Sequence, residues 1–176
     1  DRTVSKITPD GTSTILGTTG PNSYGITIDG SGNVYTTSLN ESAVYKITPD
    51  GTSTTFATTG VNPYGITIDT VGNLYTANHG DNTVSKITPD GTSTILGTTG
   101  QGPYDIVIDQ SGNLYTSNIG ENTISKITPD GTSTTFATTG PSPYNLTIDT
   151  HGNLYTANAG NNTVSKMSPT GTSIIF

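Results

Sequence analysis

The sequence predicts an all-β fold, a β-propeller built from four-stranded antiparallel blades. A strict 40-residue period is the first observation, because Thr-Pro-Asp begins at Thr8, Thr48, Thr88 and Thr128 and a degenerate copy begins at Ser168. The second is that each period contains four short strand-like segments and no helical periodicity. Four short strands in a repeat of this length are typical of a propeller blade.

The segment 61–100 shows how each blade is expected to form. Its predicted strands cover 64–69, 73–78, 83–88 and 92–98. The joint Val71-Gly72-Asn73 contains a turn glycine, and Pro89-Asp90-Gly91 combines a proline with a turn-like φ and a glycine that can take a positive φ. Both joints therefore predict β-hairpins.

The hydrophobic pattern predicts that both faces of a blade are covered. Ile66 and Ile68 alternate with Thr67, but Val84 and Ile87 are three residues apart and point to opposite faces of their strand. A half-solvated sheet would keep one face polar. Blades that stack radially cover both faces, which favours a propeller over the main alternative, a β-solenoid.

The expected organisation is a single propeller domain of about four and a half blades, an open or partial ring. Residues 4–20 are identical to 84–100 and residues 46–60 to 126–140, which indicates an ancestral two-blade unit of 80 residues. The chain begins at Asp1, which predicts a processed start or a fragment. Because an open ring leaves unpaired strand edges, we expect self-association or a larger propeller. The predicted units are an outer hairpin in 1–20 and blades in 21–60, 61–100, 101–140 and 141–176.

Composition limits the classes of partner. The chain has 176 residues, of which 11% are charged, and a net charge of −7 with only six Lys and Arg, so a nucleic-acid partner is not expected. The absence of cysteine removes disulfides and thiolate metal sites. The sequence has no run of 18 apolar residues, so no membrane span is predicted.

The copies differ mainly at one rim of the expected propeller. The differences gather before the first strand of each blade, at 21–23, 61–63, 101–103 and 141–143, and after the second strand, at 38–42, 78–82, 118–122 and 158–162. In a four-stranded meander these loops share one face, which we call the variable rim. Binding sites are often diversified in this way over a fixed scaffold, although unrestrained loops also drift.

Polar and aromatic residues on this rim are the candidate binding groups. Tyrosines that begin the innermost strands are expected to ring the mouth of the channel, and with nearby amides they would suit a glycan or a peptide. Two alternatives stay open: the tyrosines wedge between blades with their hydroxyls bonded to backbone, and Asp105 is a solvated surface acid. The candidates are Tyr24, Tyr64, Tyr104, Tyr144, Asn78, Asn118, Asn158, His79, Asp105 and Asn145.

The run "ITPDGTSTTFATTGVNPYGITIDTVGNLYTANHGDNTVSKITPDG" carries a family resemblance. Its Pro-Tyr-Gly-Ile and Ile-Thr-Pro-Asp-Gly motifs resemble NHL-repeat propellers and, more closely, the streptogramin B (virginiamycin B) lyase family, over the entire chain. That resemblance implies a propeller and, in the lyases, elimination by a histidine and acid cluster on one rim, for which only His79 with Asp81 could stand in. The second strand departs from the lyase pattern, because a Trp-Phe-Thr-Glu-like segment is replaced by Leu74-Tyr75-Thr76-Ala77 and its equivalents.

No catalytic, metal or cofactor site is predicted. His79 lies on the variable rim, whereas His151 lies in a turn on the opposite face, so the two are not expected to meet. The spacing around Asp29, Asp69, Asp109 and Asp149 lacks the several oxygen ligands of a calcium loop, and side-chain capping of the turn explains these residues better.

The sequence therefore favours a non-catalytic binding or scaffold module. Richness in Thr, Asn and Gly with few lysines is compatible with a location outside the cell or on its surface. The expected partner is a polar ligand, such as a glycan or peptide, or a protein, recognised through the variable rim. The alternative is an incomplete lyase-like enzyme whose active residues lie in blades outside this chain.

Overall fold

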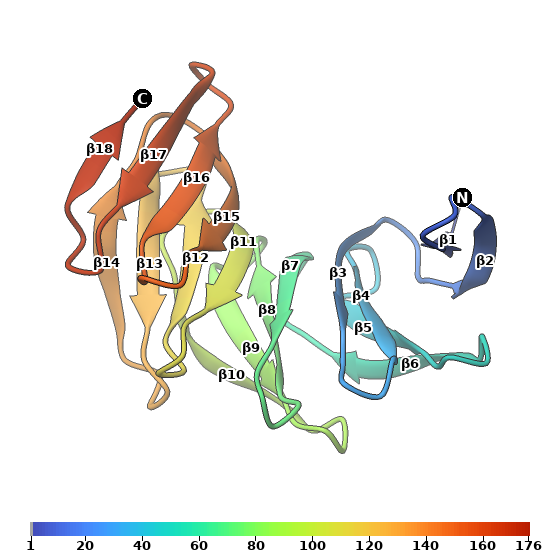
Figure 1. The fold of residues 1–176 in the computed structure, drawn as a ribbon. Coiled ribbons are helices and arrows are strands. Elements are labelled where there is room, and N and C mark those ends of the chain that lie inside the picture. Colours follow the sequence, from blue (N-terminus) through green and yellow to red (C-terminus); the bar gives the residue numbers. More distant parts are fainter. Residues whose placement is uncertain (1) are drawn as a thin grey trace.

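The computed structural model describes residues 2–176, which form β-strands joined by turns and no helix (Figure 1). All paired strands are antiparallel neighbours in the chain. The strands of the first half are β1 (Thr3–Ile7), β2 (Ser13–Thr18), β3 (Ser23–Ile28), β4 (Val34–Ser38), β5 (Ala43–Ile47), β6 (Ser53–Thr58), β7 (Pro63–Ile68), β8 (Leu74–Asn78) and β9 (Thr83–Ile87). Those of the second half are β10 (Ser93–Thr98), β11 (Pro103–Ile108), β12 (Leu114–Asn118), β13 (Thr123–Ile127), β14 (Ser133–Thr138), β15 (Pro143–Ile148), β16 (Leu154–Asn158), β17 (Thr163–Met167) and β18 (Ser173–Ile175).

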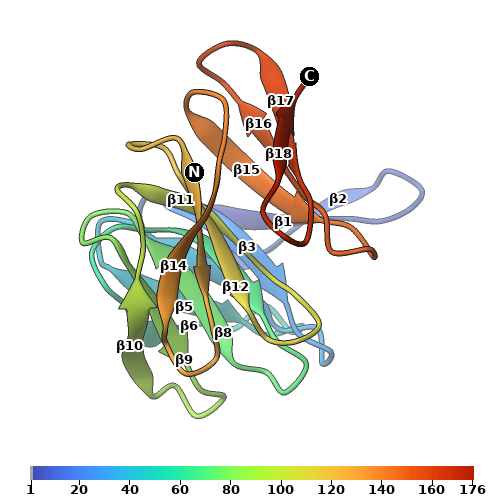
Figure 2. The same cartoon turned by 90° about the vertical axis from the view of Figure 1, so that its left-hand side faces the viewer.

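The strands group into one two-stranded and four four-stranded sheets. β1 and β2 form the N-terminal hairpin, and the others form blade 1 (β3–β6), blade 2 (β7–β10), blade 3 (β11–β14) and blade 4 (β15–β18). The sheets follow one another from the hairpin on the right of Figure 1 to blade 4 at the upper left. Figure 2 shows blade 4 nearest the viewer and the hairpin behind. This arrangement is the predicted one of about four and a half blades.

The first strand of each blade lies innermost. β7 contacts both β3 and β11, and β11 also contacts β15, so the first strands of neighbouring blades run past one another on the channel side. Because these first strands lie side by side, the loops that precede them come together at the same end of the molecule. These four loops belong to the variable rim. The scaffold therefore positions the residues of this rim around the channel.

Buried hydrophobic clusters lie between successive blades. Between blades 2 and 3, Tyr75 and Val84 pack against Ile106, Leu114 and Ile127. We call the face that meets the next blade the front and the face that meets the preceding blade the back. The same arrangement joins blade 1 to blade 2 and blade 3 to blade 4.

The prediction that both faces of a blade are covered is confirmed by two residues of β9. Val84 belongs to the cluster between blades 2 and 3, whereas Ile87 belongs to the cluster between blades 1 and 2. Both side chains have 0% exposure. Their three-residue spacing thus indicates a strand packed on two sides.

The turn between the first two strands of each blade is capped by an aspartate. In blade 2, Asp69 Oδ1 accepts the N–H groups of Val71 and Asn73, at 3.0 and 2.8 Å. Its Oδ2 accepts the Asn73 amide at 2.7 Å and the Tyr75 hydroxyl at 3.0 Å. Blades 1, 3 and 4 repeat this network, which confirms the predicted turn capping, around Asp29, Asp109 and Asp149.

We predict that acid destabilises the fold through these carboxylates. Hydrogen bonds from the Asn153 side chain outweigh burial and lower the pKa of Asp149 from 3.8 to about 2. Because the folded-state pKa lies below the unfolded value, the contribution to stability is complete above about pH 4 and is lost as the pH falls towards about 2. Urea unfolding between about pH 7 and pH 2.5 measures this loss, and in Asp149→Asn it should be smaller. Stability that is unchanged down to about pH 2.5 would contradict the prediction.

Candidate functional site

The tyrosines that begin the four inner strands pack against one another. The ring centroids of Tyr24 and Tyr64 are 4.8 Å apart, those of Tyr64 and Tyr104 are 4.9 Å apart, and those of Tyr104 and Tyr144 are 4.5 Å apart. All four pairs are tilted or edge to face, as aromatic rings prefer. We call these four residues the tyrosine cluster. Their rings contact one another across neighbouring blades, on the channel side of the inner strands.

Exposure differs strongly within the tyrosine cluster. Tyr24 is 55% exposed and Tyr104 only 8%, because Tyr104 has neighbours on both sides whereas Tyr24 has a complete blade on one side alone. The hydroxyls of Tyr24 and Tyr104 contact each other. Burial, together with this hydrogen bond, raises the pKa of Tyr104. Tyr64 and Tyr144 are half-buried, so three of the four rings present surface to solvent.

His79 extends the aromatic surface, but its expected acidic partner is occupied elsewhere. The His79 ring lies 5.0 Å from that of Tyr64. Asp81 accepts the N–H of Val61 at 2.9 Å and the hydroxyl of Thr83 at 2.8 Å, so it holds the loop together. Within residues 2–176 no hydrogen bond or ion pair joins His79 to Asp81.

The three rim asparagines do not reach the surface, which corrects the prediction that their amides face a ligand. Asn118 donates to Thr123 and Ser125 at 3.0 and 2.9 Å and accepts from Thr116 at 3.0 Å. Asn78 and Asn158 donate in the same way to their own third strands. Their exposures are 0–1%. Each asparagine is the last residue of the second strand and pairs with the threonine that begins the third strand. In this register the amide points into the blade and not to solvent.

A glycine before each rim loop leaves room for the buried asparagine amide. A Cβ on Gly100 would lie 2.7 Å from the Asn118 amide nitrogen, so the backbone before the rim loop passes directly over the amide. Gly60 and Gly140 stand in the same relation to Asn78 and Asn158. The repeated Thr-Thr-Gly sequence is therefore the signal that could have placed the amides inside.

Asp105 is a partly buried link between blades 3 and 4, and not a solvated surface acid. Its Oδ1 accepts the N–H of Ile106 and its Oδ2 accepts the N–H of Leu146, both at 2.9 Å. Burial raises the pKa of Asp105, and the two backbone hydrogen bonds oppose this rise. Asn145 is exposed beside it. Both residues line a recess of about 240 Å³ on the channel side, together with three tyrosines of the cluster.

The sequence did not lead us to predict a second set of hydrogen bonds between blades. Thr37 accepts the N–H of Gly25 at 2.8 Å and donates to the carbonyl of Tyr64 in the next blade at 2.8 Å. In the same way, the Ser117 hydroxyl accepts the N–H of Asp105 at 3.1 Å and donates to the carbonyl of Tyr144 in the next blade at 2.5 Å. Blades 2 and 4 have alanine at this position, so the alternation of hydroxyl and methyl in the second strand was the available signal.

His151 lies on the face opposite the variable rim, away from the tyrosine cluster. The His151 N–H donates to Asp149 at 2.9 Å in the capped turn. Within residues 2–176 no group of three or more His, Cys, Asp or Glu side chains could hold a metal ion. In the same residues, no helix has the length and apolar character needed to cross a membrane.

Comparison with known proteins identifies the family. A model of the virginiamycin B lyase family matches residues 1–175. The chain belongs to this family. No sequence among curated proteins matches it.

Solved structures of virginiamycin B lyases share the fold. A catalytically inactive variant of virginiamycin B lyase from Staphylococcus aureus, in a structure with quinupristin, superposes with a TM-score of 0.85 at 24% identity, covering 99% of this chain and 62% of that one. A streptogramin B lyase gives a TM-score of 0.86 at 20% identity, covering 99% and 61%. The chain thus spans about 62% of the length of these lyases.

A similar fold also occurs in a structure of a nidogen and laminin complex. The superposition has a TM-score of 0.80 at 22% identity and covers 94% of this chain and 67% of that one. Identities at this level show the β-propeller fold alone.

We predict that Asp105→Asn destabilises the protein although the side chain keeps its shape. The amide group has only one acceptor oxygen, so one of the two backbone N–H groups would face an N–H₂ donor, at a cost of about 1–3 kcal/mol. Urea unfolding at neutral pH measures the change in the free energy of unfolding. Glu121→Gln, the same carboxylate-to-amide change at an exposed residue, is the matched control and should change it by less than about 0.5 kcal/mol. Equal effects of the two variants would contradict the linking role.

Proposed function

We propose that this chain is a non-catalytic binding module that recognises a peptide segment or a protein surface at the tyrosine cluster, outside the cell. The observation that carries the proposal is the convergence of four tyrosines and His79 on the variable rim, where the repeats differ from one another. Tyrosine is enriched at protein interfaces because it offers a large, rigid apolar body with a polar hydroxyl.

The geometry of the rim favours a peptide or protein over a glycan. The amides of Asn78, Asn118 and Asn158 are buried and bonded within their blades, so they are not free to bind sugar hydroxyls. The exposed surface of Tyr24 and the half-buried rings of Tyr64 and Tyr144 remain. An aromatic surface beside the exposed amide of Asn145 suits the apolar and aromatic side chains and the backbone of a partner.

The nidogen and laminin complex supports the protein-binding form of the proposal. That structure, by its name, contains a protein complex, and one of its chains shares the propeller fold of this chain. At 22% identity the support is by analogy of fold, since unrelated functions use the same propeller.

A lyase function is the second candidate, and family membership is the observation that favours it. The chain spans about 62% of the lyase length, so active residues in further blades would be required. Against it, the one rim histidine, His79, packs on Tyr64 while Asp81 is engaged by its own loop.

We predict that replacing the two outer tyrosines of the cluster, in Tyr24→Ala with Tyr144→Ala, weakens binding to a peptide array by at least about tenfold, as loss of aromatic hot-spot residues does. Val71→Ala, on the opposite face, is the control and should bind as the unchanged protein does. Circular dichroism checks that all variants are folded. Binding that the double variant retains would remove the tyrosine cluster from the proposal.

The same preparation distinguishes the two candidates. Incubation with quinupristin, followed by chromatography, should leave quinupristin unchanged. Its conversion by the chain would favour the lyase, and binding to a glycan array without peptide binding would contradict the choice of partner.

A further inference from the structure

The recess on the channel side of the blades contains one charged side chain, that of Asp105. We call it the Asp105 recess. It has a volume of about 240 Å³, and its uncharged lining includes the rings of Tyr24, Tyr64 and Tyr104 and the amide of Asn145. Within residues 2–176 no Lys, Arg or His side chain lines it. The negative charge of Asp105 therefore has no counter-charge in the recess.

The Asp105 carboxylate can still accept hydrogen bonds from a ligand. Each of its oxygens accepts one backbone N–H, from Ile106 and from Leu146, both at 2.9 Å. An ionised carboxylate offers about four acceptor positions, so about two are left after these bonds. The backbone bonds favour the ionised form, whereas burial raises the pKa of Asp105 and makes the isolated charge unfavourable. A bound cation would offset this cost of burial.

The other blades show that the fold does not require a charge at this position. Blades 1 and 2 have Gly25 and Gly65 there, and the inner strands of blades 1, 2 and 3 still pack against one another. A Cβ on Gly65 would lie 2.9 Å from Asp105 Oδ1, so this glycine leaves room for the carboxylate. Asp105 thus adds a charge to a junction that the repeat also builds with glycine.

The lining of the Asp105 recess suits an organic cation better than a metal ion. A calcium ion takes six to eight oxygen ligands, and within residues 2–176 no group of three or more potential metal ligands is found. A carboxylate beside aromatic rings is a favourable environment for an ammonium group. The volume of about 240 Å³ lies below the roughly 300–1,000 Å³ of pockets that hold drug-sized ligands, so a single side chain fits better.

The charges of the variable rim have the same sign as Asp105. Glu41, Asp81 and Glu121 follow the second strands of blades 1, 2 and 3 at equivalent positions, and the net charge of the chain is −7. Charges of one sign around a recess attract a ligand of the opposite sign. We therefore expect the rim to favour the approach of a cation.

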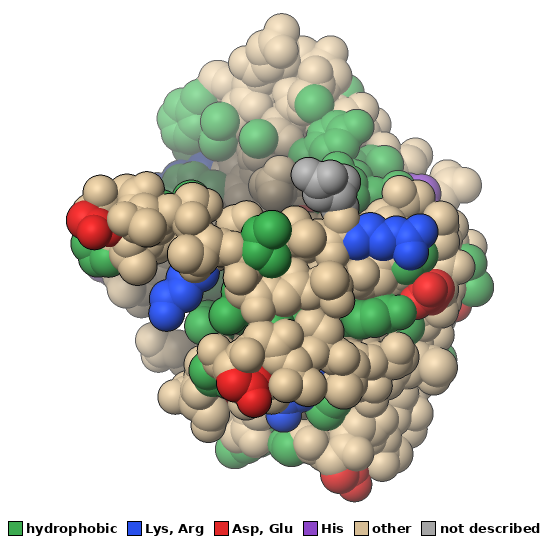
Figure 3. Space-filling model, turned by 90° about the vertical axis from the view of Figure 1, so that its right-hand side faces the viewer, with side chains coloured by type: hydrophobic (Ala, Val, Ile, Leu, Met, Phe, Trp, Pro, Cys, Tyr) green, Lys and Arg blue, Asp and Glu red, His purple; other side chains and the backbone are tan. Residues whose placement is uncertain are grey.

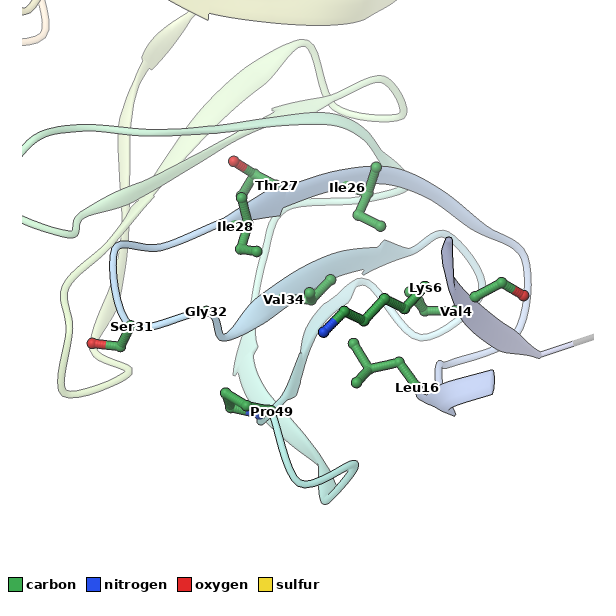
Figure 4. A pocket seen from close by; sticks show the side chains of 11 residues that line it. Val4, Lys6, Leu16, Ile26, Thr27, Ile28, Ser31, Gly32, Val34 and Pro49 are labelled. Atoms are coloured by element: carbon green, nitrogen blue, oxygen red, sulfur yellow. The ribbon is translucent and has the colours of Figure 1, made fainter. Parts of the chain in front are cut away.

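A larger groove nearby has the opposite charge. On the face drawn in Figure 3, charged side chains are few and are separated by uncharged ones. The groove lies between the N-terminal hairpin and blade 1, has a volume of about 730 Å³ and is lined mainly by apolar side chains (Figure 4). Its one charged residue is Lys6. A cation is therefore expected at Asp105 and not in this groove.

We propose that the Asp105 recess binds an alkylammonium cation, the end of a lysine side chain that belongs to the peptide or protein partner. The ammonium group donates to a free acceptor position of Asp105, and the methylene groups lie along the tyrosine rings. This inference deepens the proposed function and rests on it for the partner, but the cation site itself stands on the recess alone.

The first test uses n-butylammonium as the probe and n-butanol as its uncharged counterpart. Each is titrated into the 176-residue protein at constant ionic strength, and backbone amide chemical shifts are followed by NMR. Butylammonium should give saturable shifts at Asp105 and Asn145 and bind at least about tenfold more tightly than butanol, since a hydrogen bond to a charged group contributes about 1.5–3 kcal/mol. Equal binding of the two probes, or no saturable shift up to about 50 mM butylammonium, overturns the proposal.

Matched variants locate the cation. Asp105→Asn should weaken butylammonium binding by at least about tenfold, with circular dichroism to check that the variant is folded. Asn145→Lys is the second variant, because it places an ammonium group at an exposed position of the same recess and should block the probe without removing a backbone link. Glu121→Gln removes a rim charge outside the recess and should change binding by less than about twofold. Binding that is unchanged in both Asp105→Asn and Asn145→Lys overturns the proposal.

Peptide binding separates this inference from the proposed function. Each peptide that binds in the array is made again with norleucine in place of lysine, which keeps the length of the side chain and removes the charge. Binding should fall by at least about tenfold. Peptides that bind equally well with norleucine overturn the lysine inference and leave the proposed function standing. Butylammonium binding at Asp105 without any peptide binding would support the cation site and remove the proposed function.

Discussion

The packing of each blade's back on the front of the preceding blade is the constraint on which the structure depends. A fully buried Ile or Leu side chain contributes about 1.5–3 kcal/mol, which exceeds the roughly 0.5–1.5 kcal/mol of a typical hydrogen bond. The clusters around Leu74, Leu114 and Leu154 therefore dominate the interaction between blades. Because no single blade covers both of its own faces, each blade depends on its neighbours, as in other repeat proteins. Within residues 2–176, Ile26 and Val164 are exposed in the first and the last blade, whereas their counterparts between two blades are buried.

Hydrogen bonds between the inner strands add to this packing and differ from blade to blade. Thr37 and Ser117 bond across to the next blade, while blades 2 and 4 carry alanine at that position. Asp105 adds a bond from blade 3 to blade 4 that the glycines of the first two blades do not provide. The two-blade unit of the sequence thus corresponds to an alternation of hydroxyl and methyl on the channel side. These differences change the rim where the tyrosine cluster lies without changing the scaffold.

Most of the fold could be predicted from sequence, but only part of the site could be. The 40-residue period, the turn chemistry and the spacing of Val84 and Ile87 determine blades with two covered faces, and the capping role of Asp69 follows from its turn. The direction of the Asn118 amide depends on the register of β12 with β13 and on the approach of Gly100, and the repeated Thr-Thr-Gly sequence is a signal for the second of these alone. The mutual packing of the tyrosines likewise depends on how closely successive inner strands approach, which no local pattern encodes.

Hydrogen–deuterium exchange across the whole chain tests most directly whether packing between blades holds the fold. Within residues 2–176, blades 2 and 3 each lie between two complete blades, whereas the N-terminal hairpin has blade 1 as its one neighbour. The amides of β8 and β12 should therefore exchange most slowly, and those of β1 and β2 fastest, with blades 1 and 4 between them. Equal protection of the hairpin and the central blades would contradict the account, because each sheet would then be stable without its neighbours.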